Sequence, residues 1–264
     1  MDSTQRFSNR VDNYVKTRPG YPAVILDYLQ EETGFGPDWT VADIGSGTGI
    51  STALFLDNGN TVYGVEPNRA MRESAEELLH SYDRFISVEG TAEHTGLETA
   101  SIDMVVASQA FHWFDPVAAK KEFRRILRNN GPVALIWNER QIDTPFEQAY
   151  ESLLLQYAID YTTVNHKNIS EEKIAAFFGA DGQGDIRLAA DPQPFRLRIA
   201  ANEQVFDRGK FKGRILSSSY MPDEQHPAYP EMIRSAEEIF EQHQEGEKVK
   251  VNYLTKLFVG RLSI

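Results

Sequence analysis

Three glycines at alternating positions, shortly after an acidic residue, are the part of this chain best suited to binding a ligand. Residues 41–44 are apolar apart from Asp43, and Gly45, Gly47 and Gly49 follow directly. Glycine adopts a positive φ at little cost, and without a Cβ its backbone can approach a ligand closely. These residues therefore predict a loop that binds a nucleotide-type cofactor.

A strand before this loop and a helix after it would position the glycines. Residues 40–44 have strand length and are rich in β-branched side chains, while Ile50, Ala53 and Leu54 fall on one face of a helix. Strand, glycine loop and helix make the first half of a βαβ unit. The start of the helix would offer unpaired N–H groups and a partial positive charge to an anionic ligand group.

Further strands are predicted along the chain, most of them alternating with helices. They are expected at residues 61–65, 85–88, 102–107, 133–137, 194–200 and 248–262. Such alternation predicts an α/β fold with a doubly wound, mostly parallel sheet of seven strands and right-handed crossovers. Ligands bind such sheets at the carboxyl ends of the strands, so Asp43, Gly45, Glu66, Thr91 and Gln109 should line one crevice.

The length of the chain suits one elaborated domain. We expect residues 1–264 to form a single domain with an N-terminal helical lid at 1–36, a cofactor-binding core at 37–138, a helical cap at 139–247 and a final strand at 248–264. The cap is expected to contain helices at 146–161, 171–178, 202–217 and 228–243, which carry apolar residues at helical spacing.

Composition restricts the partners. The net charge of −12 argues against a nucleic-acid backbone as the main partner, and no apolar run approaches the roughly 20 residues that span a bilayer. The first residues lack the basic-then-apolar order of a secretory signal, so a cytoplasmic location is expected. With no cysteine in the chain, thiolate metal sites are excluded, and no metal site is predicted. The sequence does not predict the oligomeric state.

The residue after the third glycine separates two cofactor classes. Dinucleotide-binding loops follow a Gly-x-Gly-x-x-Gly pattern, whose third glycine allows close helix packing. Ile50 occupies that position here, and the loop also lacks the lysine of a phosphate-binding P-loop. An NAD-dependent oxidoreductase is therefore disfavoured.

The order of four motifs resembles the class I S-adenosylmethionine-dependent methyltransferases. Over roughly residues 1–138 the motifs are Val41–Gly49, Val65–Asn68, Gly90–Glu93 and Ser108–Phe114. Within that family the chain is similar to the small-molecule branch that includes trans-aconitate and malonyl-carrier O-methyltransferases, because Tyr14, Arg18-Pro19 and Tyr21-Pro22 precede the glycine loop.

The resemblance implies a set of contacts to S-adenosylmethionine. Asp43, Gly45, Ser46 and Gly47 would hold its methionine part, together with Tyr14, Arg18, Ser108 and Gln109. Glu66 would accept both ribose hydroxyls, and the adenine would meet Pro67, Asn68, Met71, Thr91, Ala92 and Glu93. Thr91 stands where many relatives have an aspartate, and its hydroxyl is a weaker partner for an amino donor.

An aromatic run after the fourth predicted strand is the next chemical feature. Aromatic faces attract cations such as a sulfonium within about 6 Å, although such residues also simply fill cores. His112 and Trp113 are the predicted catalytic residues, with His112 either a general base or an orienting residue, because an ionised carboxylate acceptor needs no base.

The predicted substrate residues are Phe111, Arg214 and Tyr220. Arg214 belongs to a basic cluster with Arg208, Lys210 and Lys212, which is alternatively a solvated helix face.

These residues predict methyl transfer from S-adenosylmethionine to a small molecule, on an oxygen or a carboxylate. A non-catalytic S-adenosylmethionine-binding protein stays open as an alternative. A nucleic-acid methyltransferase is disfavoured by the acidic balance and by Ser108-Gln109-Ala110-Phe111, which stands in place of an Asn/Asp-Pro-Pro-aromatic motif.

Overall fold

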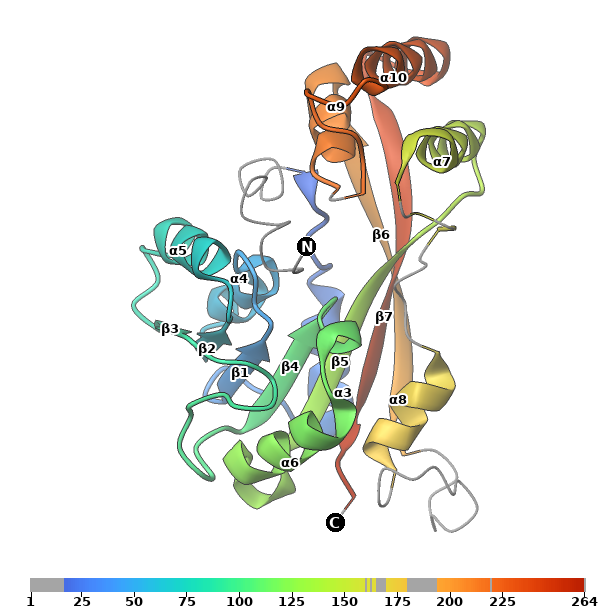
Figure 1. Ribbon diagram of the computed structural model, residues 1–264. Helices are drawn as coiled ribbons and strands as arrows, with labels where there is room; N and C mark the ends of the chain where they lie inside the picture. Colours follow the sequence, from blue (N-terminus) through green and yellow to red (C-terminus); the bar gives the residue numbers. More distant parts are fainter. Residues whose placement is uncertain are drawn as a thin grey trace. The chain divides into compact units, whose positions relative to one another are not determined.

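The computed structural model describes residues 17–159, 161, 163–164, 170–179, 194–218 and 220–263, and these contain one seven-stranded sheet (Figure 1). Its strands lie in the order β3-β2-β1-β4-β5-β7-β6. Their bounds are β1 Thr40–Ile44, β2 Thr61–Val65, β3 Phe85–Val88, β4 Met104–Ser108, β5 Pro132–Arg140, β6 Arg196–Phe206 and β7 Val249–Arg261. The pairs that join β3, β2, β1, β4 and β5 are all parallel, and the sheet as a whole is mostly parallel with some antiparallel strands. The predicted fold class is confirmed.

Helices connect most of these strands. They are α3 Val24–Thr33, α4 Ile50–Asp57, α5 Arg69–Leu78, α6 Pro116–Ile126, α7 Pro145–Tyr157, α8 Glu171–Phe178, α9 Arg208–Leu216 and α10 Tyr229–His243, with a short 3₁₀ helix η1 at Phe111–Trp113. Several begin at side chains that accept hydrogen bonds from the first helical N–H groups, as Asn68 does for α5 and Asp115 for α6. Residues 1–16 of the predicted lid lie outside the described part of the chain.

The chain divides into two compact units, each built from three segments. The core unit comprises Tyr21–Asn138, Lys167–Ala200 and Thr255–Ile264, and the cap unit comprises Met1–Gly20, Glu139–His166 and Ala201–Leu254. Strands β5, β6 and β7 each contribute residues to both units. The expected arrangement of lid, core, cap and final strand stays a prediction from the sequence.

Side chains bury both faces of the sheet in the core unit. Successive residues of β1, Val41 and Ala42, belong to two different apolar clusters, as the alternation of a strand requires. One cluster contains residues of α6 and α8, and the other contains residues of α3 and α4. A parallel strand buried on both faces explains why residues 41–44 read as a nearly continuous apolar run.

The region 202–217 corrects one prediction. It was expected to form a single helix, but β6 continues to Phe206 and α9 begins only at Arg208. From Ala200 to Phe206 more and less exposed side chains alternate, which is the period of a strand. Asp207 then accepts a hydrogen bond from the Lys210 N–H at 2.8 Å, so this side chain caps the helix and ends the strand.

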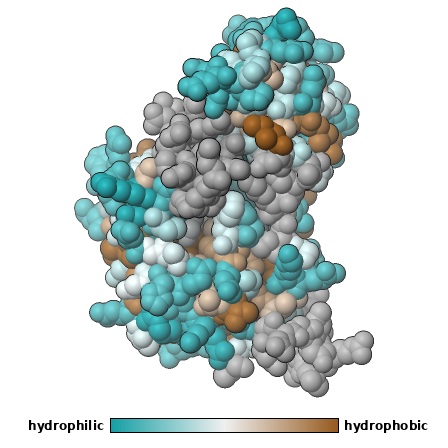
Figure 2. Space-filling view, in the orientation of Figure 1, coloured by the Kyte–Doolittle hydropathy of each residue, from teal (hydrophilic) through white to brown (hydrophobic). Residues whose placement is uncertain are grey.

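The cap unit has its own apolar cluster, formed by α7, α9, α10 and the cap-unit parts of β6 and β7. Helix α10 buries Met232, Ala236 and Phe240 on one face. Hydrophilic residues cover its outer surface in the view of Figure 2. In the described part of the chain, no helix combines the length and apolarity needed to cross a membrane.

Candidate functional site

The glycine loop between β1 and α4 folds tightly over the end of β2. The N–H groups of Gly45 and Ser46 donate to the Val65 carbonyl at 2.8 and 3.2 Å. Gly45, Gly47 and Gly49 all have positive φ, at 70°, 58° and 85°, so the predicted need for glycine is confirmed at each position. A Cβ on Gly45 would lie 2.7 Å from the Cβ of Ala110, which brings the loop against the turn that follows β4.

Asp43 presents a buried carboxylate at the base of this loop. Its Oδ2 accepts hydrogen bonds from the hydroxyls of Ser51 and Thr52, each at 2.7 Å, whereas Oδ1 has no hydrogen-bond partner among the described residues. Burial raises the pKa of Asp43 to about 6, and the two hydroxyl donors only partly oppose this rise. The site therefore keeps one buried acceptor oxygen available to a donor.

Glu66, at the end of β2, is joined directly to the loop. Its Oε2 accepts from the Gly47 N–H at 3.0 Å, and its Oε1 accepts from the Asn68 N–H at 2.8 Å. Burial raises the pKa of this carboxyl above its usual value, while those backbone donors and the charge of Arg72 lower it. Each carboxylate oxygen has a second lone pair, so Glu66 can still accept hydrogen bonds from a ligand.

The start of α5 and the loop after β3 hold the residues predicted to meet the adenine. Asn68 caps α5 by accepting from the Met71 N–H at 3.2 Å, and both side chains are buried. After β3, Thr91 is exposed, Ala92 is buried, and Glu93 accepts from the Asp115 N–H at 2.9 Å. Their contacts with a ligand stay predictions, as does that of the exposed Pro67.

Gln109 follows β4 in an unusual backbone conformation. Its φ is 54°, which is uncommon for a residue with a side chain. Its N–H donates to the Ile136 carbonyl at 2.9 Å and its side-chain amide donates to the Asn138 carbonyl at 3.2 Å, so bonds to β5 hold the conformation in place. Strained residues of this kind cluster at functional sites. The neighbouring Ser108 hydroxyl is buried, and no described residue hydrogen-bonds to it.

The aromatic run divides into a buried part and an exposed part. Phe111 is only 2% exposed and its ring lies 4.5 Å from that of Phe177, centroid to centroid, which favours the core-packing alternative at this position. Trp113 is 51% exposed, and its ring lies 4.7 Å from the half-buried ring of His112. The catalytic roles of His112 and Trp113 and the substrate contact of Phe111 stay predictions.

The remaining predicted site residues belong to the cap unit. Arg18, Arg214 and Tyr220 lie in segments of that unit, and Tyr14 lies outside the described residues. Arg214 is buried, which excludes the alternative of a solvated helix face for this member of the basic cluster. The roles of these residues in binding the cofactor or the substrate stay predictions.

Sequence reasoning missed several residues that support the site. Ser51 and Thr52 orient Asp43, and Arg72 donates to the Glu66 carbonyl at 2.9 Å. Two hydroxyls in the first turn of the helix after the glycine loop were an available signal for the first pair. No sequence signal identifies Arg72, because its partner is a backbone carbonyl. Within the described ranges, no group of three or more acidic or histidine side chains could hold a metal.

Known methyltransferases are similar to this chain in sequence. The model of a methyltransferase domain family matches residues 42–135, which run from β1 into β5. An uncharacterised methyltransferase of Bacillus licheniformis is 30% identical over 178 residues, covering 62% of this chain and 83% of that protein. An uncharacterised methyltransferase of Mycobacterium tuberculosis is 34% identical over 139 residues, and the chain spans about half of its length, 54%.

Solved structures show the same fold at low sequence identity. A candidate type II methyltransferase from Anaeromyxobacter dehalogenans has a TM-score of 0.64 and 20% identity, covering 93% of this chain and 98% of that chain. A candidate methyltransferase from an antibiotic biosynthesis pathway of Anabaena variabilis has a TM-score of 0.57 and 16% identity, covering 92% and 98%. The chain covers 83% of the Bacillus relative at 30% identity, and it carries the glycine loop and the two strand-end carboxylates. It therefore belongs to the class I S-adenosylmethionine-dependent methyltransferases.

Proposed function

We propose that the protein transfers a methyl group from S-adenosylmethionine to an oxygen atom of a small-molecule acceptor. The observation that carries this proposal is the arrangement of Asp43 and Glu66 around the glycine loop. A buried carboxylate oxygen with no hydrogen-bond partner in the described part of the chain lies at the base of the loop, and a second carboxylate is hydrogen-bonded to the Gly47 N–H.

These residues fit the cofactor. The Oδ1 of Asp43 would accept a hydrogen bond from the cationic amino group of the methionine part, and a positive charge there would offset the cost of burying this carboxylate. Glu66 would accept hydrogen bonds from the two ribose hydroxyls. Gly45, Ser46 and Gly47 would bring backbone against the methionine part, and Ser108 and Gln109 would complete that end.

When bound, S-adenosylmethionine would supply an electrophilic methyl group to the acceptor oxygen, with S-adenosylhomocysteine as the other product. The protein aligns the acceptor with that methyl group and excludes water. Trp113 and His112 are proposed to line the acceptor side and to face the cationic sulfur. An acceptor carboxylate has no proton to lose, so His112 is proposed to orient rather than to act as a base.

The acidic composition supports a small acceptor rather than a nucleic acid, since 39 acidic residues oppose 27 basic ones. The cap unit, with Arg214 and Tyr220, is proposed to select the acceptor. A helical lid over residues 1–36 and a cytoplasmic location stay predictions from the sequence.

The proposal is tested in two steps. Titration calorimetry with S-adenosylmethionine and with S-adenosylhomocysteine measures cofactor binding, and NADH serves as the competing ligand. Incubation with methyl-labelled cofactor and a panel of small acids, phenols and amines then measures transfer. Cofactor binding with transfer to an oxygen acceptor is the expected result. Binding without transfer to any acceptor would indicate a non-catalytic binding protein, and preferential NADH binding would revive the oxidoreductase alternative.

A further inference from the structure

The loop after β3, residues 90–95 of the core unit, is closed by its own backbone. The N–H of Thr91 donates to the His94 carbonyl at 3.0 Å, and the N–H of His94 donates back to the Thr91 carbonyl at 3.2 Å. A Cβ on Gly90 would lie only 2.7 Å from the Thr95 carbonyl oxygen, so a glycine is needed there. The loop is therefore compact, and it carries three of the residues predicted to meet the adenine.

Glu122, on α6, holds the end of this loop with a buried carboxylate. Its Oε1 accepts from the Thr95 N–H at 2.9 Å and from the Thr95 hydroxyl at 2.6 Å. The same hydroxyl accepts from the Leu97 N–H at 3.2 Å. Thr95 and Glu122 are both buried, and a hydrogen bond in such a region of low dielectric constant is stronger than in water. One carboxylate oxygen thus fixes both the backbone and the side chain of Thr95.

Arg125, three residues further along α6, completes the attachment. Its guanidinium donates to both carboxylate oxygens of Glu122, at 2.7 and 2.8 Å. It also donates to the Leu97 carbonyl at 2.8 Å and to the Thr99 hydroxyl at 3.1 Å. Hydrogen bonding from Arg125 lowers the pKa of Glu122 to about 2, with the Thr95 donors adding to this effect and burial opposing it. The carboxylate is therefore ionised at neutral pH.

The chain from this loop toward β4 is attached to α6 at several points. Every second residue from 93 to 99 hydrogen-bonds to α6 or to its capping residue, namely Glu93, Thr95, Leu97 and Thr99. The first of these, Glu93, accepts at 2.9 Å from the N–H of Asp115, which caps α6. Ala92 and Leu97 also belong to the same apolar cluster as buried residues of α6. The position of the loop is therefore set by α6.

We propose that Glu122, held by Arg125, is a positioning residue for the cofactor, because it fixes the loop at residues 90–95 in the conformation that binds the adenine. Glu122 acts through Thr95 and does not itself touch the cofactor. A loop that is ordered before the ligand arrives loses little conformational entropy on binding. This inference rests on the cofactor site of the function proposed above, and it does not depend on the acceptor.

Two substitutions at Glu122 separate geometry from charge. Glu122→Ala removes both bonds to Thr95. Glu122→Gln keeps a side-chain oxygen that accepts from Thr95 but loses the ion pair with Arg125. The side chain of Arg125 is 38% exposed, so its guanidinium can turn to water. If Glu122 acts by holding the loop, the glutamine should retain most of the cofactor affinity that the alanine loses.

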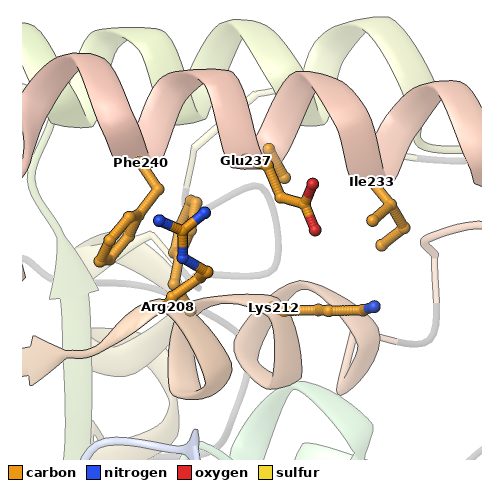
Figure 3. Close-up of a pocket in the computed structure, with 7 residues that line it drawn as sticks. Arg208, Lys212, Ile233, Glu237 and Phe240 are labelled. Carbon is orange, nitrogen blue, oxygen red and sulfur yellow. The ribbon is translucent and has the colours of Figure 1, made fainter.

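Two control variants remove carboxylates elsewhere. Asp103 accepts from the Thr40 N–H at 2.8 Å and pairs with Arg128 at 3.0 Å, at the amino ends of β1 and β4 and so away from the site at their carboxyl ends. Asp103→Ala therefore breaks similar bonds in the core unit without touching the loop. Glu237 is an exposed residue of α10, and Figure 3 shows it at a shallow pocket between α9 and α10. Glu237→Ala removes the same side chain from a helix of the cap unit.

The experiment makes two measurements on the wild type and these four variants. Hydrogen–deuterium exchange of the ligand-free proteins reports on the amides of residues 91–97. Titration calorimetry gives the Kd for S-adenosylhomocysteine and for S-inosylhomocysteine, in which hypoxanthine replaces adenine. Glu122→Ala is expected to speed exchange in the loop, to raise the Kd for S-adenosylhomocysteine by about 10–100-fold and to reduce the preference for adenine. Glu122→Gln should raise that Kd by less than about fivefold, and both controls should match the wild type in both measurements.

Three outcomes would overturn this inference and leave the proposed function standing. They are an unchanged Kd in Glu122→Ala, a loss of affinity without faster exchange in the loop, and an equal loss of affinity in Asp103→Ala. Failure of the wild type to bind S-adenosylhomocysteine would instead contradict the proposed function and this inference together. If Glu122→Ala does not fold, Thr95→Val removes the hydroxyl bond alone and should produce the same changes at a smaller size.

Discussion

At the scale of single residues, Asp43 combines a cost to stability with a proposed role in binding. The folded protein raises the pKa of this carboxyl to about 6 from an ordinary 3.8, mainly by burial. Between these values the folded state holds the proton more tightly than the unfolded state does. Ionisation of Asp43 therefore lowers the free energy of unfolding as the pH rises from about 4 to about 6.

Replacing Asp43 by Asn should therefore stabilise the protein at neutral pH. The amide oxygen can still accept from Ser51 and Thr52, and no charge is buried. We expect the free energy of unfolding at pH 7 to rise by up to about 3 kcal/mol, from a shift of roughly two pKa units, and to change little near pH 4. Urea unfolding of both proteins at the two pH values measures this. If the two proteins differ in free energy of unfolding by the same amount at pH 7 and at pH 4, the raised pKa of Asp43 is contradicted.

The same substitution should weaken cofactor binding. Loss of the charged acceptor is expected to raise the Kd for S-adenosylhomocysteine by about 10–100-fold at pH 7. In the wild type the affinity should also fall as the pH drops below about 6, where Asp43 becomes protonated, and this dependence should be much weaker in Asp43→Asn. Titration calorimetry from pH 5 to pH 8 provides the readout. Equal affinity of the two proteins at pH 7 would remove Asp43 from the binding site.

His112 offers a separate test of the chemistry. Since a carboxylate acceptor needs no base, His112→Ala should change kcat by less than about tenfold, whereas loss of a general base typically costs 100-fold or more. The rate is measured with cofactor and acceptor both saturating. His112 would be shown to act as a base by two results together. The variant would lose 100-fold or more in kcat, and the wild-type rate would depend on the ionisation of a group with a pKa near that of histidine.

At the scale of elements, the glycine loop depends on two different properties of glycine. Gly45 combines a positive φ with contact against Ala110, whereas a Cβ on Gly47 would meet nothing within 4 Å. The first position requires both the conformation and the missing side chain. The second requires the conformation alone.

Alanine substitutions separate these two requirements. Gly47→Ala should cost about 1–2 kcal/mol of unfolding free energy, from the positive φ alone. Gly45→Ala should cost more, because the added Cβ displaces the loop from the turn after β4, and it should also weaken S-adenosylhomocysteine binding. Urea unfolding and titration calorimetry of both variants give the comparison. Equal stability losses would mean that the contact with Ala110 relaxes freely.

Sequence patterns predicted these elements well where burial is two-sided. β1 and β2 occupy the predicted residues, because strands in the middle of a parallel sheet carry runs of apolar side chains. The pattern failed at residues 202–206, where the strand carries three consecutive polar side chains, Asn202, Glu203 and Gln204. Asp207 was the available signal for the start of the helix. The polar residues before it led to the prediction that the helix begins at residue 202.

The site itself was predictable only in part, for a related reason. Asp43 lies near the end of β1 and Glu66 immediately follows β2, the next strand along the chain, so the order of the strands brings them together. The left-handed conformation of Gln109 and the burial of Arg214 arise from packing between segments far apart in the chain. Such packing has no local pattern.

At the scale of the whole molecule, three long strands tie the two units into one covalent framework. β5, β6 and β7 each begin in one unit and end in the other. Trp39, Trp113 and Trp137 all lie in the core unit, so tryptophan fluorescence reports on that unit alone. The continuity of the strands leads us to expect one cooperative unfolding transition.

A substitution in the cap unit tests this coupling. Val251, in the cap-unit part of β7, is fully buried, and Val251→Ala should cost about 2 kcal/mol of unfolding free energy. If the units unfold together, the fluorescence midpoint in urea should fall by as much as the midpoint of the helical circular dichroism signal. An unchanged fluorescence midpoint would show that the core unit unfolds independently.

The strand order also determines when this protein can complete its sheet during synthesis. β6 lies at an edge and neighbours β7 alone, yet the ribosome makes β6 first and then α9 and α10 before β7. Throughout that interval β6 has no neighbour in the sheet, and an unpaired strand edge can associate with other chains. The sheet therefore closes late in translation or after it. Slower synthesis prolongs exposure of this edge, and chaperones that shield nascent chains would act on it.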